Sequence, residues 1–198
     1  MKKLLIRRTA KKYINIHNDI SNTANHLRTR VEEMDKAGNR EGISLDITAC
    51  LVLLAFTFES RLNFIGHHKV GDWCERERFP TKLKIVRKAL NLKPDYSVRP
   101  YSSIRALQDF RNTIAHGKPI IIEINETIEG DPDAHPDDME LRAPWEESLT
   151  TTFMRQCSDD IDEIWKEWLN AAEIDSYQTL THGEFGYQLL EGPNGLGG

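Results

Sequence analysis

An arginine, an asparagine and a histidine follow one another closely in the stretch "LQDFRNTIAHGKPI" (residues 107–120), as Arg111, Asn112 and His116. A guanidinium can hold a phosphodiester through two parallel hydrogen bonds. An imidazole exchanges protons near pH 7. Together these groups suit metal-free cleavage of RNA, in which a base deprotonates the ribose 2′-hydroxyl and a cation stabilises the charge on the phosphorane.

A second interpretation of the same stretch is purely structural. A histidine in the last turn, a glycine directly after it and a proline two positions further on are typical of the end of a helix. The letters "AHGKP" contain all three signals. The histidine would then interact with the negative end of the helix dipole.

Helix geometry separates Arg111 from His116. Residues five apart on an α-helix differ by about 140° in direction and about 7.5 Å along the axis. One helix alone therefore makes a poor site. Two copies related by a two-fold axis would bring two arginines and two histidines into one cleft, so the chemistry predicts a homodimer.

The wording "RNTIAHG" resembles the Arg-X4–6-His signature of HEPN-domain proteins, in which a polar residue, often Asn, follows the arginine. An apolar segment with an internal glutamate, "FESRL" (residues 58–62), and a basic segment "FPTKLKIV" resemble the helices that precede this motif in HEPN-like families. The likeness covers about residues 13–173 in helix order, and about 107–119 in residue-level detail.

The resemblance implies a metal-independent endoribonuclease of a toxin–antitoxin, abortive-infection or other bacterial defence system, acting as a dimer. It assigns Arg111 as phosphate ligand, His116 as general acid and base, and Asn112 as a positioning residue. Glu59 and Lys118 are supporting candidates, although Glu59 could simply pair with an arginine such as Arg61 or Arg105. RNA is the expected partner, with an antitoxin or regulatory protein as another.

Other HEPN proteins are non-catalytic binding or scaffold modules, so a silent helical module for protein or nucleic acid is the alternative function. No metal or cofactor is expected. The adjacent His67 and His68 would point apart on a helix, which does not suit a metal site. Trp165 and Trp168 lie on an apolar stripe, which favours packing over base stacking.

Charge is distributed unevenly along the chain. Residues 61–118 hold thirteen basic and five acidic residues, whereas residues 119–198 hold three basic and nineteen acidic residues. One interpretation is a polyanion-binding surface that the acidic part covers. The other is that the two parts attract each other within the fold.

Length and composition indicate one domain in a reducing, cytoplasmic setting without a membrane partner. The 198 residues can bury a large core. Three widely spaced cysteines favour neither disulfides nor a zinc site, and Cys50 is expected in the core. The longest apolar run has eight residues, short of a membrane span, and the N-terminus lacks a signal-peptide core.

Hydrophobic periodicity predicts an all-α, up-and-down, HEPN-like bundle of about five helices. The helices are expected at 13–37, 44–66 or 44–71 (capped by Ser44 or Asp46 and ended by Gly66 or Gly71), 79–92, 102–116 (capped by Ser102 or Ser103) and 147–173, with a short β segment near 120–124. Residues 1–12 form a basic N-terminal segment, 13–175 the helical domain with an acidic loop at 125–147, and 176–198 a C-terminal tail without clear periodicity.

Overall fold

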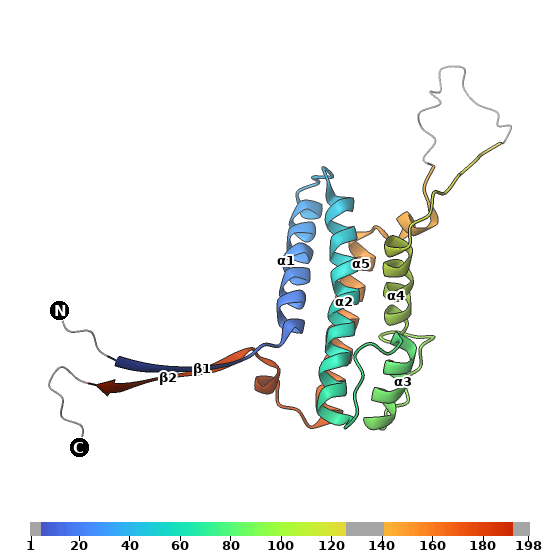
Figure 1. Ribbon diagram of the computed structural model, residues 1–198. Helices are drawn as coiled ribbons and strands as arrows, with labels where there is room; N and C mark the ends of the chain where they lie inside the picture. The colour runs from blue at the N-terminus through green and yellow to red at the C-terminus, as the bar shows by residue number, and fades with distance from the viewer. Residues whose placement is uncertain (1–4, 126–140, 192–198) are drawn as a thin grey trace, which may run out of the picture.

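A computed structural model describes residues 5–125 and 141–191. The chain is mainly helical, as predicted, and carries a two-stranded antiparallel sheet in addition (Figure 1). The elements are β1 (Leu5–Tyr13), α1 (Ile16–Lys36), α2 (Ile43–Lys69), α3 (Phe79–Ala89), α4 (Ser102–Ala115), α5 (Thr151–Ala172) and β2 (His182–Glu191), with short 3-10 helices η2 (Pro144–Ser148) and η3 (Ser176–Thr179).

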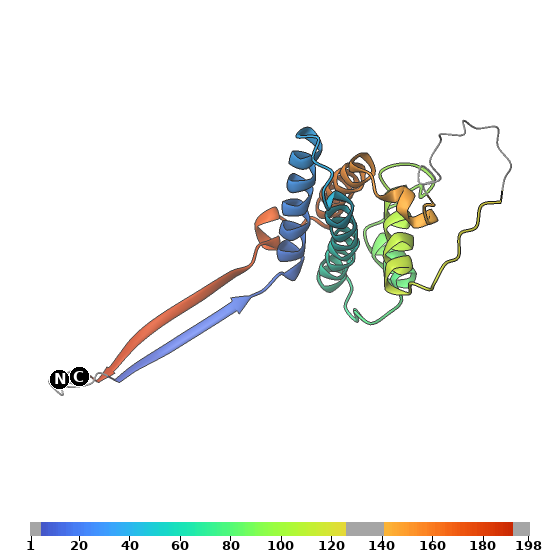
Figure 2. The ribbon, with the colours of Figure 1, turned by 90° about the horizontal axis from the view of Figure 1, so that it is seen from above.

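Helix α2 is the centre of the bundle, as its apolar circumference predicts. It packs against α1, α3, α4 and α5, and α1 and α4 lie on opposite sides of it (Figures 1 and 2). Cys50 is fully buried in this helix, which confirms its expected place in the core. By length and composition the helix could cross a membrane, but the core helix of a soluble protein has the same features, and a little under half of its most apolar stretch is buried in the bundle.

Helix α5 closes the bundle from behind α2, with Trp168 among its buried residues. Two of its acidic side chains pair with bases of residues 61–118: Asp160 with Arg99 at 2.8 Å and Asp162 with Arg61 at 2.9 Å. For α5, the acidic part of the sequence therefore compensates the basic part within the fold. The acids of residues 126–140 lie outside the described residues.

The two termini pair with each other, which the sequence did not predict. Strand β1 pairs antiparallel with β2 from Leu5 opposite Glu191 to Tyr13 opposite His182. This ribbon projects from one end of the bundle, on the side of α1 (Figure 2). The side chain of Asn15 donates to the carbonyl of Leu180 at 3.0 Å and so ties the base of the ribbon to the start of α1.

Several predicted boundaries were wrong. Residues 120–124 are extended but pair with no described strand, so the β segment predicted there is absent. The first helix begins at Ile16 and not at Tyr13, because Tyr13 is the last residue of β1 and residues 14–15 connect the strand to the helix. Neither Ser102 nor Ser103 caps α4: Ser103 is buried and donates its hydroxyl to Asp160. Of the predicted acidic loop, residues 126–140 lie outside the described part of the chain.

Candidate functional site

The side chain of Arg111 lies against α2. One guanidinium nitrogen, Nη2, donates to Oε2 of Glu59 at 2.8 Å, and the guanidinium carbon lies 5.4 Å from the ring centre of Phe56. Its Nη1 donates to the side-chain oxygen of Asn112 at 3.1 Å. The arginine is therefore held on two sides and stacked on an aromatic ring, so its orientation is fixed before any ligand arrives.

Glu59 joins Arg111 to a buried lysine. The Nζ of Lys82 donates to Oε1 of Glu59 at 2.7 Å, to the side-chain oxygen of Asn63 at 3.2 Å and to the carbonyl of Glu75 at 3.2 Å. Lys82 is only 1% exposed. A buried ammonium needs this full set of acceptors, because its loss of hydration is otherwise uncompensated. Lys82 thus fixes the carboxylate that orients Arg111.

Glu59 does not pair with Arg61 or Arg105, the alternative that the sequence left open. Glu59 pairs with Lys82 and Arg111, whereas Arg61 pairs with Asp162 at 2.9 Å and Arg105 lies 3.9 Å from Asp109. The internal glutamate therefore belongs to the cluster around Arg111.

Asn112 connects the arginine to the outer surface of α4. Its side-chain oxygen accepts from Nη1 of Arg111 and, at 3.2 Å, from Nε2 of Gln108 one turn earlier. Asn112 also lines an open depression of about 830 Å³ at the end of α4. It is the residue that the arginine cluster and the depression share.

His116 lies in that depression. It is exposed and directly follows α4, and its backbone N–H donates to the carbonyl of Asn112 at 2.9 Å. Lys118 and Trp145 line the same depression. Within the described residues, no side-chain hydrogen bond to the imidazole occurs, so its ring nitrogens are accessible to a ligand.

The end of α4 differs in one respect from an ordinary glycine stop. The left-handed glycines of the described chain are Gly38 and Gly42, and Gly117 is not among them. The chain leaves the helix through His116 (φ −114°, ψ 24°) and continues extended toward Ile120. The turn that typically accounts for a "His-Gly" helix end is therefore not formed.

Within one protomer, Arg111 and His116 reach different surfaces. The arginine faces α2, whereas the histidine faces the depression, and Asn112 lies between them. This agrees with the angular separation expected for residues five apart on a helix. A site that uses both groups on one phosphate needs the surface at the end of α4 to face a second copy or a ligand that spans Asn112.

Sequence reasoning missed Lys82 and Gln108. Lys82 belongs to the basic segment "FPTKLKIV", but it lies four residues before the buried Val86 and so on the same, inner face of the helix. That spacing was the available signal. Gln108 stands one turn before Asn112, a spacing at which polar side chains meet on a helix.

The two neighbouring histidines of α2 have separate partners. Nε2 of His67 lies 2.6 Å from Oε1 of Glu75, and Nδ1 of His68 lies 2.9 Å from the carbonyl oxygen of Phe64. In the part of the chain that the structure describes, no three histidine, cysteine or acidic side chains gather around a common point.

No protein-family model, no curated protein and no solved structure matches this chain. The resemblance to HEPN-domain proteins therefore stays a prediction from the sequence. The functional proposal for this chain rests on the geometry around Arg111, Asn112 and His116.

Proposed function

We propose that this protein is a cytoplasmic, metal-independent, HEPN-like endoribonuclease that acts as a homodimer. The observation that carries the proposal is the pre-oriented Arg111 and the accessible His116 on the two sides of Asn112, which contacts the arginine and lines the depression that contains the histidine. Arginine held by Glu59 and Asn112 keeps unused N–H groups for a phosphate. The imidazole of His116, which no side chain of the described residues engages, can exchange a proton.

The reaction that fits these groups is transesterification. His116 takes the proton of a ribose 2′-hydroxyl, and the 2′-oxygen attacks the adjacent phosphorus. Arg111 donates hydrogen bonds to the non-bridging oxygens as charge develops. The bond from phosphorus to the 5′-oxygen breaks, and that oxygen takes a proton from an imidazolium. The products are a 2′,3′-cyclic phosphate and a 5′-hydroxyl.

A second copy is expected to cover the end of α4. Several large apolar side chains are exposed there, including Ile114, Ile120 and Ile121, the last of them 84% exposed. Clustered exposed apolar groups next to polar site residues are typical of interaction surfaces. A two-fold pairing of this surface would place the depression of one protomer opposite that of the other.

The main test is incubation of the purified full chain with total RNA in EDTA. We expect cleavage to disappear in Arg111→Ala and in His116→Ala, and to persist in His26→Ala, which alters an exposed histidine on α1. The new ends should be 5′-hydroxyls that accept a phosphate without prior phosphatase treatment. Equal cleavage by all four proteins would indicate a contaminant and contradict the proposal.

Mixing the two inactive variants tests the dimer. If each site combines Arg111 of one protomer with His116 of the other, a heterodimer of Arg111→Ala and His116→Ala retains one complete site and some cleavage returns. If light scattering gives the molar mass of a monomer and no cleavage occurs at any protein concentration, the proposed dimeric site is contradicted.

A non-catalytic binding module is the second candidate function, and one observation favours it. Arg111 is already paired with Glu59 at 2.8 Å, so an intramolecular partner occupies part of its hydrogen-bonding capacity. A dimer that binds RNA without cleaving it, alone or with a regulatory protein or antitoxin, would support this alternative.

A further inference from the structure

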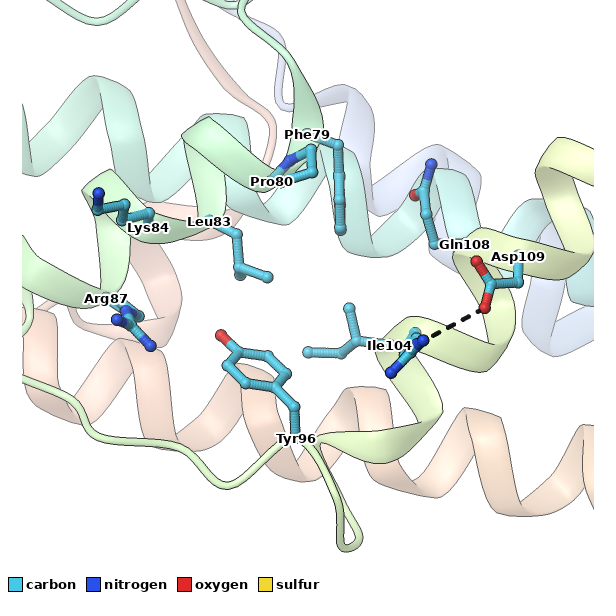
Figure 3. A pocket seen from close by; sticks show the side chains of 10 residues that line it. Phe79, Pro80, Leu83, Lys84, Arg87, Tyr96, Ile104, Gln108 and Asp109 are labelled. Carbon is cyan, nitrogen blue, oxygen red and sulfur yellow. Dashed lines mark ion pairs between the residues drawn. The ribbon is translucent and has the colours of Figure 1, made fainter.

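A second pocket lies between α3 and α4. Its volume is about 390 Å³, within the range of roughly 300–1,000 Å³ typical of small-molecule sites. Its walls are mostly apolar, and Figure 3 shows Phe79 and Pro80 on one side, Tyr96 on the other, and Leu83 and Ile104 between them. Two aromatic rings thus flank an apolar slot that no described residue fills.

Basic side chains surround this slot. Lys84 and Arg87 reach its edge from α3, and Arg105 reaches it from α4. One acidic residue, Asp109, lines it as well, and it lies 3.9 Å from Arg105 in a pair that is largely exposed and therefore weak. The edge keeps a net positive charge, which suits an anionic ligand with a flat apolar part.

The hydroxyl of Tyr96 adds a polar group at the edge. In Figure 3 it points toward the guanidinium of Arg87. Burial raises the pKa of Tyr96, and Arg87 acts in the opposite direction. The phenol is thus protonated at neutral pH and can donate or accept a hydrogen bond.

The pocket adjoins the candidate site. Gln108 lines the pocket and donates to Asn112, and Asp109 lines both the pocket and the depression that contains His116. Ile104 and His116 are twelve residues apart, so the whole surface extends about 18 Å along α4. A ligand that reaches both places is an extended chain, and the aromatic walls and basic edge of the pocket suit one that carries flat rings and phosphates.

We propose that the pocket between α3 and α4 binds one unpaired base of a single-stranded RNA whose backbone continues to Asn112 and His116. Because it names the substrate class of the same surface, the inference rests on the proposed function. The base lies between Phe79 and Tyr96, and Lys84 and Arg87 contact the adjoining phosphates. Bases of a duplex are stacked and cannot enter, so the pocket selects single strands.

The test measures binding of an unstructured 12-nucleotide RNA by fluorescence anisotropy. Every protein carries His116→Ala, so that the RNA stays intact, and every protein is the full chain. Lys84→Ala removes a cation at the pocket. Lys88→Ala is the matched control, because Lys88 is an exposed lysine of the same helix that does not line the pocket. Leu83→Phe places a larger side chain in the slot.

The expected result has two parts. Lys84→Ala weakens binding several-fold, whereas Lys88→Ala does not. Replacing one base at a time with an abasic sugar weakens binding about ten-fold at one position of the RNA, and Leu83→Phe removes this difference. Thermal unfolding of Leu83→Phe verifies that the variant is folded.

Equal effects of Lys84→Ala and Lys88→Ala, or indifference to every abasic position, would overturn the base pocket. Binding of duplex RNA with the same affinity as single-stranded RNA would also overturn the base pocket. The outcome is separable from that of the proposed function. If the wild-type chain cleaves RNA but binding shows no preferred base position, only the pocket is refuted. If binding depends on the position of an abasic sugar but the wild-type chain never cleaves the RNA, only the enzyme is refuted.

Discussion

The charge cluster around Glu59 makes a quantitative prediction about stability. Glu59→Gln keeps the size of the side chain but removes two ion pairs, at 2.7 Å to Lys82 and 2.8 Å to Arg111. Lys82 is 1% exposed and would keep only neutral oxygen acceptors, from Asn63 and Glu75. A buried charge without its counter-charge is strongly destabilising.

The expected loss is about 3 kcal/mol of the free energy of unfolding, at the low end of the range for a buried pair because Glu59 itself is 24% exposed. For a chain of this length, that corresponds to a Tm lower by about 10 °C. The measurement is thermal and urea unfolding followed by the helical circular dichroism signal.

Glu32→Gln is the matched control. Glu32 also accepts from two guanidiniums, those of Arg28 and Arg155, but its partners are 22% and 45% exposed. Its loss should cost less than about 1 kcal/mol, as for surface pairs.

A double variant tests the reason for the loss. Adding Lys82→Met to Glu59→Gln removes the uncompensated charge and should recover part of the lost stability. If Glu59→Gln is as mild as Glu32→Gln, or if Lys82→Met lowers stability further, the cluster does not act as a buried electrostatic unit.

Two further predictions concern the start of α1, where His17 lies, and the end of α2, where Gly66 lies. His17 is 3% exposed, and burial, followed by the charge of Arg61, lowers its pKa from 6.5 to about 4. Between about pH 6.5 and pH 4, His17 is protonated in the unfolded chain but stays neutral in the folded chain. Stability should therefore fall from pH 6.5 to 4 by about 3 kcal/mol on account of this group. In urea titrations, His17→Phe should flatten that slope and His26→Phe should not; an unchanged slope in His17→Phe would contradict the assignment. In the second prediction, Gly66→Ala would place a Cβ 2.3 Å from the ring of Trp73, whereas Gly71→Ala meets nothing within 4 Å. We expect a loss of about 1–3 kcal/mol for the first change and little for the second. Equal Tm values for the two would show that the ring moves aside without cost.

The helical part of the fold could be predicted because its signals are local. The apolar circumference of α2, Pro80 in the first turn of α3 and the apolar stripe of α5 each specify a helix within one segment. The ribbon could not be predicted in the same way, since each strand finds its partner at the other end of the chain. The alternation of Phe185, Tyr187 and Leu189 was the one visible signal.

Residues 120–124 show the reverse case. The run is rich in isoleucine and favours a strand by composition, but no described segment offers it a partner, so it stays extended and unpaired. β-propensity describes a side chain suited to a sheet, and a sheet requires a second strand.

The candidate site was predictable in its residue types and less so in its contacts. The spacing of Arg111, Asn112 and His116 indicated phosphodiester chemistry, and helix geometry indicated that Arg111 and His116 would point in different directions. The link from Arg111 through Glu59 to Lys82 crosses three helices. Such a link depends on how the helices pack, which a one-dimensional pattern does not contain.

The pairing of β1 with β2 has a consequence for the order of folding. Joining Leu5 to Glu191 closes a loop that runs from residue 5 to residue 191, the longest and so the costliest in chain entropy among the pairings of the described residues. The helices must assemble first and bring the two ends together, since local contacts form faster than distant ones. The strands are also largely solvent-exposed and separate from the core, so they should open before any helix when the molecule is heated. Amide exchange would then be fastest in the ribbon, while the bundle stays closed.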